Sequence, residues 1–558
     1  MTVQVDVLVL GAGAAGIRAA IAARDEGAQV LIVSKGAFGK SGSSFYPLSP
    51  GWGIQASAPE TPEDSPDVHL ADVLEAAQGV CRPELARILT AEAPDRIREL
   101  QAWGLPFEKH EDGSYVRVRG CFSSRERCFQ VSGVRAIARA FRSQLERRGV
   151  RILEHHMAVR LVLDENGECR GAIVANREGK VELFLASATV LATGGAGQLF
   201  RWNLNTQDIT GDGQALALEA GAAVENMEFF QIGMGIVSPL KRGLFLDRVF
   251  IFNPPLRDHA GHEILPSEIP APFDPADCLR IRGYHYPFTS RYISRYVDYA
   301  IYKRLLAGEK SILVDLGGVP KEELIGTPLA RIWYEWLLEA GFDPQSSPLE
   351  ITLCAHAFNG GLCIDEEGWT GVPRLFAAGE VAAGPHGADR PGGNMHAACQ
   401  VFGARAGRAA AATPAPQKWE DFSRLLNQME GEINALLRRD SGLSVEEAHR
   451  RLQRAMWENV LVARDSESLN QALEEINALR ERSREFYLAR PGHLYMALAL
   501  RNMLTVGEII VRAAALRRES RGSHWRVDFP FLDPRFNGRF AFRLENGELK
   551  YSVHGAKL

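Results

Sequence analysis

A short apolar segment that runs into a glycine-rich turn is the strongest constraint on how this chain can fold. Residues 5–10 are rich in Val and Leu, as expected of a buried strand in a parallel sheet. They are followed by Gly11-Ala12-Gly13-Ala14-Ala15-Gly16, an Ala-rich helical stretch over 17–28 and a second apolar strand over 30–33. This order predicts a complete βαβ unit, the building block of a doubly wound α/β domain.

The spacing of the three glycines in this turn predicts a dinucleotide site. Gly11 permits the tight turn, Gly13 lets a pyrophosphate approach the backbone, and Gly16 lets the helix pack on the strand. The helix would then present its positive N-terminal end to the phosphates. An ordinary tight turn is the alternative, but the strand before the motif and the helix after it favour a binding site. The acidic residue that usually holds a ribose after the second strand is missing, and Ser34-Lys35 stand there.

Glycine is frequent, with 53 residues among 558, and much of it lies in later blocks. Segments 191–197, 210–215 and 375–381 each combine apolar residues with a glycine turn. The stretch from about 235 to 290 is instead rich in Pro, Phe, Arg and His. Glycine-rich blocks on both sides of a different middle predict one discontinuous domain that carries an insertion. After a Thr-Pro-Ala-Pro linker, apolar residues at helical spacing over 419–437 open a helical region that reaches about Leu516.

The charge and cysteine content exclude several classes of protein. A formal net charge of -5 provides no basic field for nucleic acid or an anionic membrane. The eight cysteines are scattered without a CxxC pair, which argues against a disulfide framework, a zinc site or an iron–sulfur site in this chain. No signal peptide and no apolar run of about 18 residues is evident. We therefore expect a cytoplasmic protein with no metal, no nucleic-acid partner and no direct membrane insertion, which associates with a membrane only through a partner.

The glycine blocks also carry a resemblance to a known family. Together with His386-Gly387-Ala388-Asp389-Arg390 and Glu519-Ser520-Arg521-Gly522-Ser523-His524, they make the chain similar, up to about Arg526, to the fumarate reductase / succinate dehydrogenase / L-aspartate oxidase flavoproteins. The resemblance implies an α/β fold with a FAD-binding Rossmann-like domain, an inserted capping domain and a helical C-terminal domain. On that basis we expect the FAD-binding domain over 1–232 and 345–414, the capping domain over 233–344, the helical domain over 415–517 and a C-terminal tail over 518–558.

The same resemblance implies which residues bind FAD. Backbone amides of the first turn would bind the pyrophosphate, Glu380 would accept hydrogen bonds from ribose hydroxyls, and the backbone at 394–396 would lie against the flavin ring. The implied residues are Gly11, Gly13, Ala14, Ala15, Gly16, Ser34, Lys35, Ser41, Ser43, Thr193, Gly194, Gly195, Asp212, Glu380, Asn394, Met395 and His396. Gly42 stands where the membrane-complex members carry a histidine that attaches the flavin covalently, so we expect non-covalent FAD.

Three residues match family positions that act on the substrate. Arg291 matches an arginine that delivers or removes a proton opposite the flavin, although Tyr292 replaces the aspartate that usually follows it. His356 and Arg390 match residues that bind substrate carboxylates, and a planar guanidinium suits bidentate recognition of a planar anion. A structural ion pair or a buried core residue is the alternative for each of the three.

One family position on the substrate side is lost. After Met227-Glu228-Phe229-Phe230-Gln231 the family carries a histidine for the second carboxylate, and this chain has Gly233 in its place. We therefore expect a substrate other than plain succinate or fumarate, one that is larger or has a single carboxylate. His285, between Tyr284 and Tyr286 in the inserted segment, is a weaker candidate for the same site.

These features predict a FAD-dependent oxidoreductase that transfers a hydride between flavin and a carbon next to a carboxylate or similar group of a small acidic organic substrate. Because no second dinucleotide motif is evident, the expected electron partner is an electron-carrier or iron–sulfur subunit, with a quinone or oxygen as other possibilities. Two alternatives stay open. An aspartate-oxidase-like amino-acid oxidase is disfavoured by Gly233, and a subunit that only passes electrons within an iron–sulfur complex is disfavoured by Arg291, His356 and Arg390.

Overall fold

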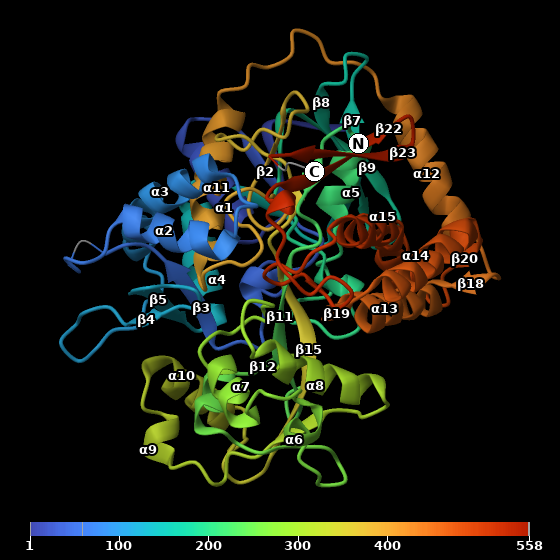
Figure 1. Ribbon diagram of the computed structural model, residues 1–558. Coiled ribbons are helices and arrows are strands. Elements are labelled where there is room, and N and C mark those ends of the chain that lie inside the picture. Colours follow the sequence, from blue (N-terminus) through green and yellow to red (C-terminus); the bar gives the residue numbers. More distant parts are fainter. Residues whose placement is uncertain (1, 59, 556–558) are drawn as a thin grey trace.

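A mostly parallel sheet gathers strands from distant parts of the chain around the glycine-rich turn (Figure 1). The computed structural model describes residues 2–58 and 60–555. β1 (Thr2–Leu10) lies inside the sheet and pairs in parallel with β2 (Val30–Val33) and β9 (Val181–Leu191), which confirms the predicted βαβ unit. The inner halves of β1 and β2 are apolar because both faces of these strands are buried. The other strands of this sheet are β6 (Arg151–Leu153), β7 (His156–Leu163), β8 (Cys169–Asn176) and β17 (Leu375–Ala377).

Two helices pack backbone to backbone beside this sheet. α1 (Ala14–Asp25) follows the first glycine turn, and α11 (Asn394–Ala411) follows the last glycine-rich block. A Cβ added at Gly403 would lie 2.8 Å from the carbonyl oxygen of Ala15, and one added at Gly407 would lie 2.2 Å from that of Ala19. Glycine at both positions therefore lets the helices touch directly. Because Gly403 meets the start of α1, the first turns of α11 project beyond it toward the substrate side.

The middle of the chain forms a separate body, green in Figure 1, below the sheet. β11 (Phe230–Ser238) and β15 (Leu349–Phe358) lead into and out of it as an antiparallel pair. This body is the inserted capping domain, and β11 runs across the predicted boundary at 232–233. Its other elements are β12 (Gly243–Leu244), β13 (Leu256–Arg257), β14 (Ile312–Val314), α6 (Leu265–Glu268), α7 (Pro275–Arg282), α8 (Arg295–Leu306), α9 (Lys321–Leu324) and α10 (Pro328–Glu339).

The N-terminal part of the chain adds a second, smaller group of elements after the βαβ unit. This group contains a three-stranded antiparallel sheet in which β5 (Glu126–Ser132) pairs with both β3 (Gly51–Gln55) and β4 (Arg117–Arg119). The other elements of this group are α2 (Pro66–Ala77), α3 (Pro83–Ala102) and α4 (Val134–Arg147). A further helix, α5 (Asp212–Glu219), follows the sheet strand β9 and is not part of this group.

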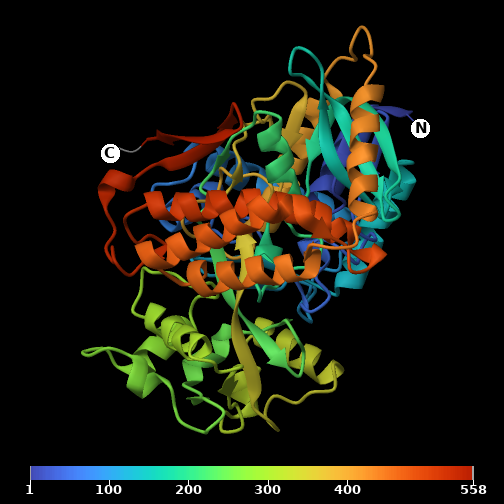
Figure 2. The same cartoon turned by 90° about the vertical axis from the view of Figure 1, so that its right-hand side faces the viewer.

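The C-terminal helices are α12 (Ser423–Leu437), α13 (Val445–Val460), α14 (Ser466–Glu481) and α15 (Leu494–Leu516). Three of the four, α13, α14 and α15, lie side by side across the molecule, and α12 packs apart from them against β9 (Figure 2). The helix expected from Trp419 begins only at Ser423. α15 is long and apolar enough to cross a membrane, but 72% of its apolar window is buried inside the protein, as in a core helix.

The C-terminal tail, for which no elements were expected, ends in a β-hairpin. β22 (Arg539–Glu545) and β23 (Glu548–His554) pair antiparallel, and β22 adds to β10 (Val224–Glu225), which also pairs with β16 (Gly361–Leu362). The turn is Asn546-Gly547, and both residues have positive φ, as a type I′ hairpin turn requires. Phe540 and Phe542 are buried, so that this hairpin closes one edge of the FAD-binding part.

Candidate active site

A cavity of about 370 Å³ opens where the glycine turn, the start of α11 and the capping domain meet. Its volume lies within the range of small-molecule sites, about 300–1,000 Å³. Most of the predicted site residues line it, although they come from segments far apart in the sequence. Those that line it are Gly11, Gly13, Ala14, Ala15, Ser34, Lys35, Ser41, Ser43, Thr193, Gly194, Asp212, His356, Glu380, Arg390, Met395 and His396. Arg291, Gly16, Gly195 and Asn394 do not.

The glycine turn has the space that a pyrophosphate needs. A Cβ at Gly11 would lie 2.1 Å from the carbonyl oxygen of Ala192, and one at Gly16 would lie 2.0 Å from that of Gly11. These two glycines are therefore required by the protein itself. At Gly13, by contrast, the nearest atom to an added Cβ is Ser44 Oγ at 3.5 Å, so the open side of this glycine faces the cavity. The start of α1 can thus receive an anionic group on its backbone amides.

Lys35, which follows β2 where an acidic residue is missing, pairs with Asp212 at the start of α5. The Lys35 ammonium donates to Asp212 Oδ2 at 2.9 Å and to Thr210 Oγ1 at 2.7 Å. Asp212 Oδ1 accepts a hydrogen bond from Asn502 of α15 at 2.8 Å. The carboxylate at this end of the cavity is therefore supplied by α5 and held by α15, and the charge of Lys35 is already paired.

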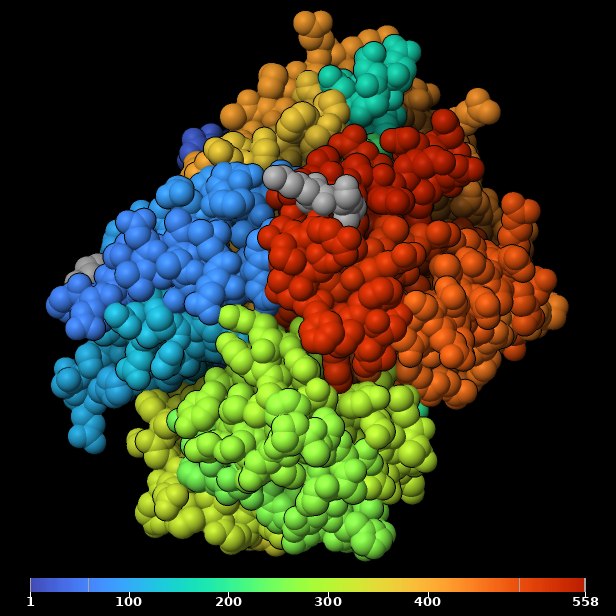
Figure 3. Space-filling view, viewed as in Figure 1, coloured from blue at the N-terminus to red at the C-terminus, as the bar shows by residue number. Residues whose placement is uncertain are grey.

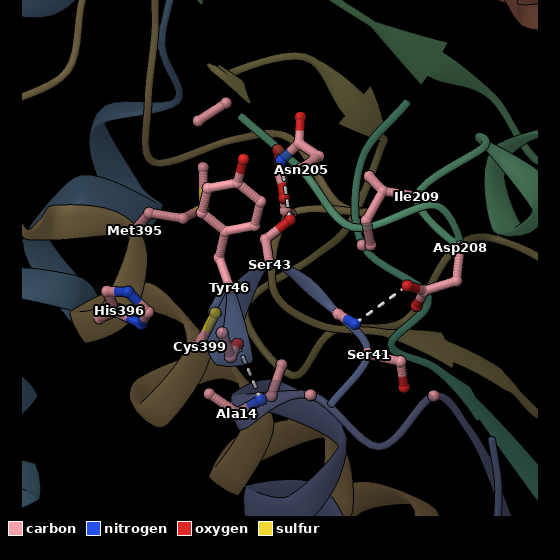
Figure 4. Close-up of a pocket in the computed structure, with 18 of the residues that line it drawn as sticks. Ala14, Ser41, Ser43, Tyr46, Asn205, Asp208, Ile209, Met395, His396 and Cys399 are labelled. Carbon is pink, nitrogen blue, oxygen red and sulfur yellow. Dashed lines mark hydrogen bonds between the residues drawn. The ribbon is translucent and has the colours of Figure 1, made fainter. Parts of the chain in front are cut away.

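The loop after β2 is fixed to the cavity wall by hydrogen bonds (Figure 4). Gly42 N–H donates to Asp208 Oδ1 at 3.1 Å, Asn205 Nδ2 donates to Ser43 Oγ at 2.9 Å, and Ala14 N–H donates to Ser44 Oγ at 3.1 Å. Gly42 has a φ of +83°, a conformation that residues other than glycine rarely adopt.

Glu380 lies deep in the cavity at the end of β17. Its Oε1 accepts a hydrogen bond from Phe358 N–H at 2.9 Å. A Cβ at Gly195 would lie 2.5 Å from the same oxygen, so Gly195 acts by leaving room for Glu380. Burial raises the pKa of Glu380 to about 7.

The start of α11 presents two of its three expected residues to the cavity. Met395 and His396 line it, and the His396 ring stacks on Trp52 with centroids 4.2 Å apart. The Asn394 side chain points elsewhere, because its Oδ1 accepts a hydrogen bond from His69 Nε2 at 2.9 Å. Trp52, in β3, also lines the cavity and was not among the predicted residues.

Arg390 is a buried cation without a carboxylate partner. Its side chain donates to the Gln231 Oε1 and, at 3.2 Å, to the carbonyl oxygen of Pro391, while its Nε has no hydrogen-bond partner among the described residues. Within the described part of the chain no carboxylate lies within salt-bridge distance of it. Burial lowers its pKa, and the more distant charge of Glu380 acts in the opposite direction.

His356 belongs to β15, and its side chain lies near Arg390. Its Nδ1 has no partner within residues 2–58 and 60–555. Burial and the nearby Arg390 charge lower the pKa of His356 to about 4, so that the ring is neutral at physiological pH. A guanidinium and a neutral imidazole that face one cavity form a site for an anion.

The structure places the Arg291 side chain outside the cavity. Its Nη2 donates to Glu75 Oε1 of α2 at 2.7 Å, and the residue lines a second hollow with Gln78 and Phe531. On this face the green surface of the cap meets the blue and red surfaces of the other parts (Figure 3). The backbone of Arg291 is nevertheless tied toward the site, because its N–H donates to Thr289 Oγ1, which in turn donates to Asp389 Oδ2 at 2.7 Å.

His285 does not reach the cavity, but its neighbour does. The His285 nitrogens are 2.9 Å from the carbonyl oxygen of Pro287 and 2.9 Å from Ser294 Oγ, which makes it a structural residue of the cap. Tyr286 lines the cavity instead, and nothing in its local sequence distinguishes it from Tyr284, which is exposed.

A glycine-rich βαβ unit whose helix α1 packs on α11, with a cap over the cavity beside them, is the architecture of a FAD-binding flavoprotein. Comparison with family models agrees. A FAD binding domain matches residues 6–252 and 274–395, and a fumarate reductase flavoprotein C-terminal domain matches residues 449–544. The chain belongs to the fumarate reductase and succinate dehydrogenase flavoprotein family and is a FAD-dependent oxidoreductase.

Similar proteins span the full chain. One subunit of the fumarate reductase (CoM/CoB) of Methanothermobacter marburgensis is 34% identical over 96% of this chain and 96% of its own length. An L-aspartate oxidase of Pseudomonas aeruginosa is 31% identical over 95% of this chain and 96% of its own. Among solved structures, Mycobacterium smegmatis Sdh1 in complex with UQ1 superposes with a TM-score of 0.84 at 28% identity, covering 99% of this chain and 94% of that one.

Proposed function

We propose that this flavoprotein reduces or oxidises the carbon–carbon bond next to a carboxylate in a small organic acid. The observation that supports this most directly is Arg390, a buried guanidinium in the cavity with no carboxylate partner within the described residues. An unpaired buried cation is costly, and it is retained where an anionic ligand completes it.

In this proposal Arg390 and His356 hold the substrate carboxylate. The guanidinium makes charge-assisted hydrogen bonds to the carboxylate oxygens. The neutral imidazole of His356 adds a hydrogen bond without the cost of a second buried charge. Both groups draw electron density from the adjacent carbon. When bound, FAD supplies the acceptor or donor of a hydride at one carbon, and the protein handles the proton at the other.

We assign the proton transfer to Arg291. Its guanidinium pairs with Glu75 at the seam between the cap and α2, and its backbone is linked through Thr289 to Asp389, next to Arg390. In this role the guanidinium would have to exchange Glu75 for the substrate. Tyr292 replaces the usual acidic neighbour and instead packs against Arg291, with 5.4 Å between guanidinium and ring centre.

We further propose that FAD is bound non-covalently and that electrons pass to or from a separate carrier, for which an iron–sulfur subunit is the candidate. The methanogen relative supports this because it is itself designated one subunit of a larger enzyme. The proposed location is the cytoplasm, with any membrane association made through that partner.

The proposal is tested by anaerobic reoxidation. The bound flavin is reduced with light and deazaflavin, and enoates, dicarboxylates and imino acids are then added one at a time. We expect at least one enoate to restore the absorbance of the oxidised flavin. If only imino acids do so, the chain is an amino-acid oxidase. If no acid does so but an added ferredoxin does, it is an electron-transfer subunit, and the proposal is wrong.

Arg291→Lys should lower the rate of enoate-dependent reoxidation by about 100-fold or more, the usual contribution of a proton-transfer group. FAD content should not change, because Arg291 lies outside the cavity wall. Glu75→Gln, which only frees the guanidinium, is not expected to slow the reaction. An unchanged rate in Arg291→Lys would show that another group moves the proton.

A further inference from the structure

Tyr286 occupies the space that a side chain at position 233 would need. A Cβ added at Gly233 would lie 2.3 Å from the Tyr286 hydroxyl oxygen and 2.5 Å from its Cζ. Gly233 lies in β11 and Tyr286 in the cap segment that follows α7, so two positions far apart in the sequence meet here. The tyrosine can stand here only because residue 233 has no side chain.

The Tyr286 ring is held in place by the chain around it. Phe288 N–H donates to the carbonyl oxygen of Ile232 at 2.7 Å, which ties this segment to β11 next to Gly233. The neighbouring His285 is fixed through both of its nitrogens. The ring of Tyr286 also meets that of His356 edge-on, with centroids 5.3 Å apart. Its position is therefore preorganised beside the anion site.

The hydroxyl group of Tyr286 is buried and has no hydrogen-bond partner in the described part of the chain. A buried hydroxyl is normally paired, so an unpaired one that lines a ligand cavity indicates a missing partner. Burial raises the pKa of Tyr286 well above its usual value, which keeps the hydroxyl protonated and able to donate.

The charges around the cavity allow one substrate carboxylate rather than two. Of the Lys and Arg side chains in the described chain, only Lys35 and Arg390 line the cavity, and Lys35 is paired with Asp212. The cap side of the wall is apolar, with Leu244, Phe245 and Leu329. A second carboxylate would lie there against one neutral hydroxyl, which is costly in an apolar setting.

We infer that Tyr286 is the second substrate-contacting residue, and that it selects an unsaturated monocarboxylic acid whose far end carries an uncharged acceptor, such as an ester or ketone oxygen, on an apolar body. The carboxylate binds Arg390 and His356, and the Tyr286 hydroxyl donates to the uncharged oxygen. This inference rests on the proposed function, because it identifies the substrate class of the same cavity.

The test compares three probes in the anaerobic reoxidation assay. They are fumarate, with two carboxylates, monomethyl fumarate, with one carboxylate and one ester, and crotonate, with one carboxylate and no second acceptor. For the parent chain we expect kcat/KM for monomethyl fumarate to exceed that for fumarate by about tenfold or more. Tyr286→Phe should lower the value for monomethyl fumarate by about tenfold, the effect of one hydrogen bond, and leave crotonate within about twofold.

A purely structural role for Tyr286 gives a different result. Because the hydroxyl is unpaired, Tyr286→Phe should not lower the midpoint of thermal unfolding, whereas a loss of stability would assign it to folding. The paired variant Gly233→His with Tyr286→Gly exchanges the tyrosine for a histidine, and we expect it to shift the preference toward fumarate.

The failures of the two proposals are distinguishable. If no probe or other enoate reoxidises the parent flavin, the proposed function fails. If fumarate outperforms monomethyl fumarate in the parent chain, or Tyr286→Phe affects all three probes equally, the proposed function stands and the role of Tyr286 is overturned.

Discussion

Arg390→Gln is expected to abolish most turnover and yet leave the protein at least as stable as the parent chain. The substrate carboxylate loses its charged partner, which costs about 2–5 kcal/mol and lowers kcat/KM about 30-fold or more. At the same time the folded protein no longer buries a cation that has no carboxylate within salt-bridge distance among the described residues. Turnover is measured with the best acid from the reoxidation screen, and stability is measured by thermal unfolding with FAD present.

Arg282→Gln provides the matched control. Arg282 is equally buried, but its side chain pairs with Asp247 at 2.6 Å and with Asp298 at 2.7 Å. Its replacement leaves two buried carboxylates unpaired and should lower the free energy of unfolding by about 3–5 kcal/mol. If Arg390→Gln destabilises the chain as much as this control does, Arg390 is a structural residue and the anion site is elsewhere.

Two substitutions in the glycine-rich turn should have different effects, since Gly11→Ala should impair folding and Gly13→Ala should impair FAD binding. Gly11→Ala combines a φ of +118° with a Cβ 2.1 Å from a carbonyl oxygen, so we expect a loss of about 2–6 kcal/mol of stability and little soluble protein. Gly13→Ala has a φ of -78° and its nearest contact at 3.5 Å. It should therefore fold normally but place a methyl group where the pyrophosphate binds, and so weaken FAD binding about tenfold or more.

Gly27→Ala is the control for strain alone. It has a φ of +91° and no atom within 4 Å of an added Cβ, so its cost should be about 1–2 kcal/mol with FAD binding unchanged.

FAD content is measured after acid precipitation, and a flavin that stays with the pellet would contradict non-covalent binding. Normal FAD affinity in Gly13→Ala would place the pyrophosphate away from this turn.

The geometry of the glycine-rich turn could be predicted from the sequence because it depends on residues that are neighbours in the chain. A strand, three glycines at fixed spacing and a helix specify one backbone geometry, and the structure has it. Lys35 shows the limit of this reasoning. The sequence shows that an acidic residue is missing after β2, but only the fold shows that Asp212 lies within hydrogen-bond distance of the lysine.

The substrate side was less predictable because it depends on contacts between distant segments. Gly233 was recognised as a lost histidine, but the tyrosine that fills its space lies much further along the chain, in the cap. The orientation of the Arg291 side chain depends on Glu75 of α2, which no local pattern indicates. The hairpin at the end of the chain did carry a local signal, the Asn546-Gly547 turn, which is typical of two-residue hairpin loops.

The glycine contact between α1 and α11 has a consequence for how this enzyme can diversify. Gly403 and Gly407 let main chain approach main chain, so the distance between the two helices is short and leaves no room for a side chain at these two positions. The separation between the pyrophosphate end of the cofactor site and the residues at 395–396 is then a fixed dimension of the scaffold. Substitutions in the cap can reshape the substrate wall without shifting this dimension, so that new substrates can be accommodated while the redox centre keeps its alignment.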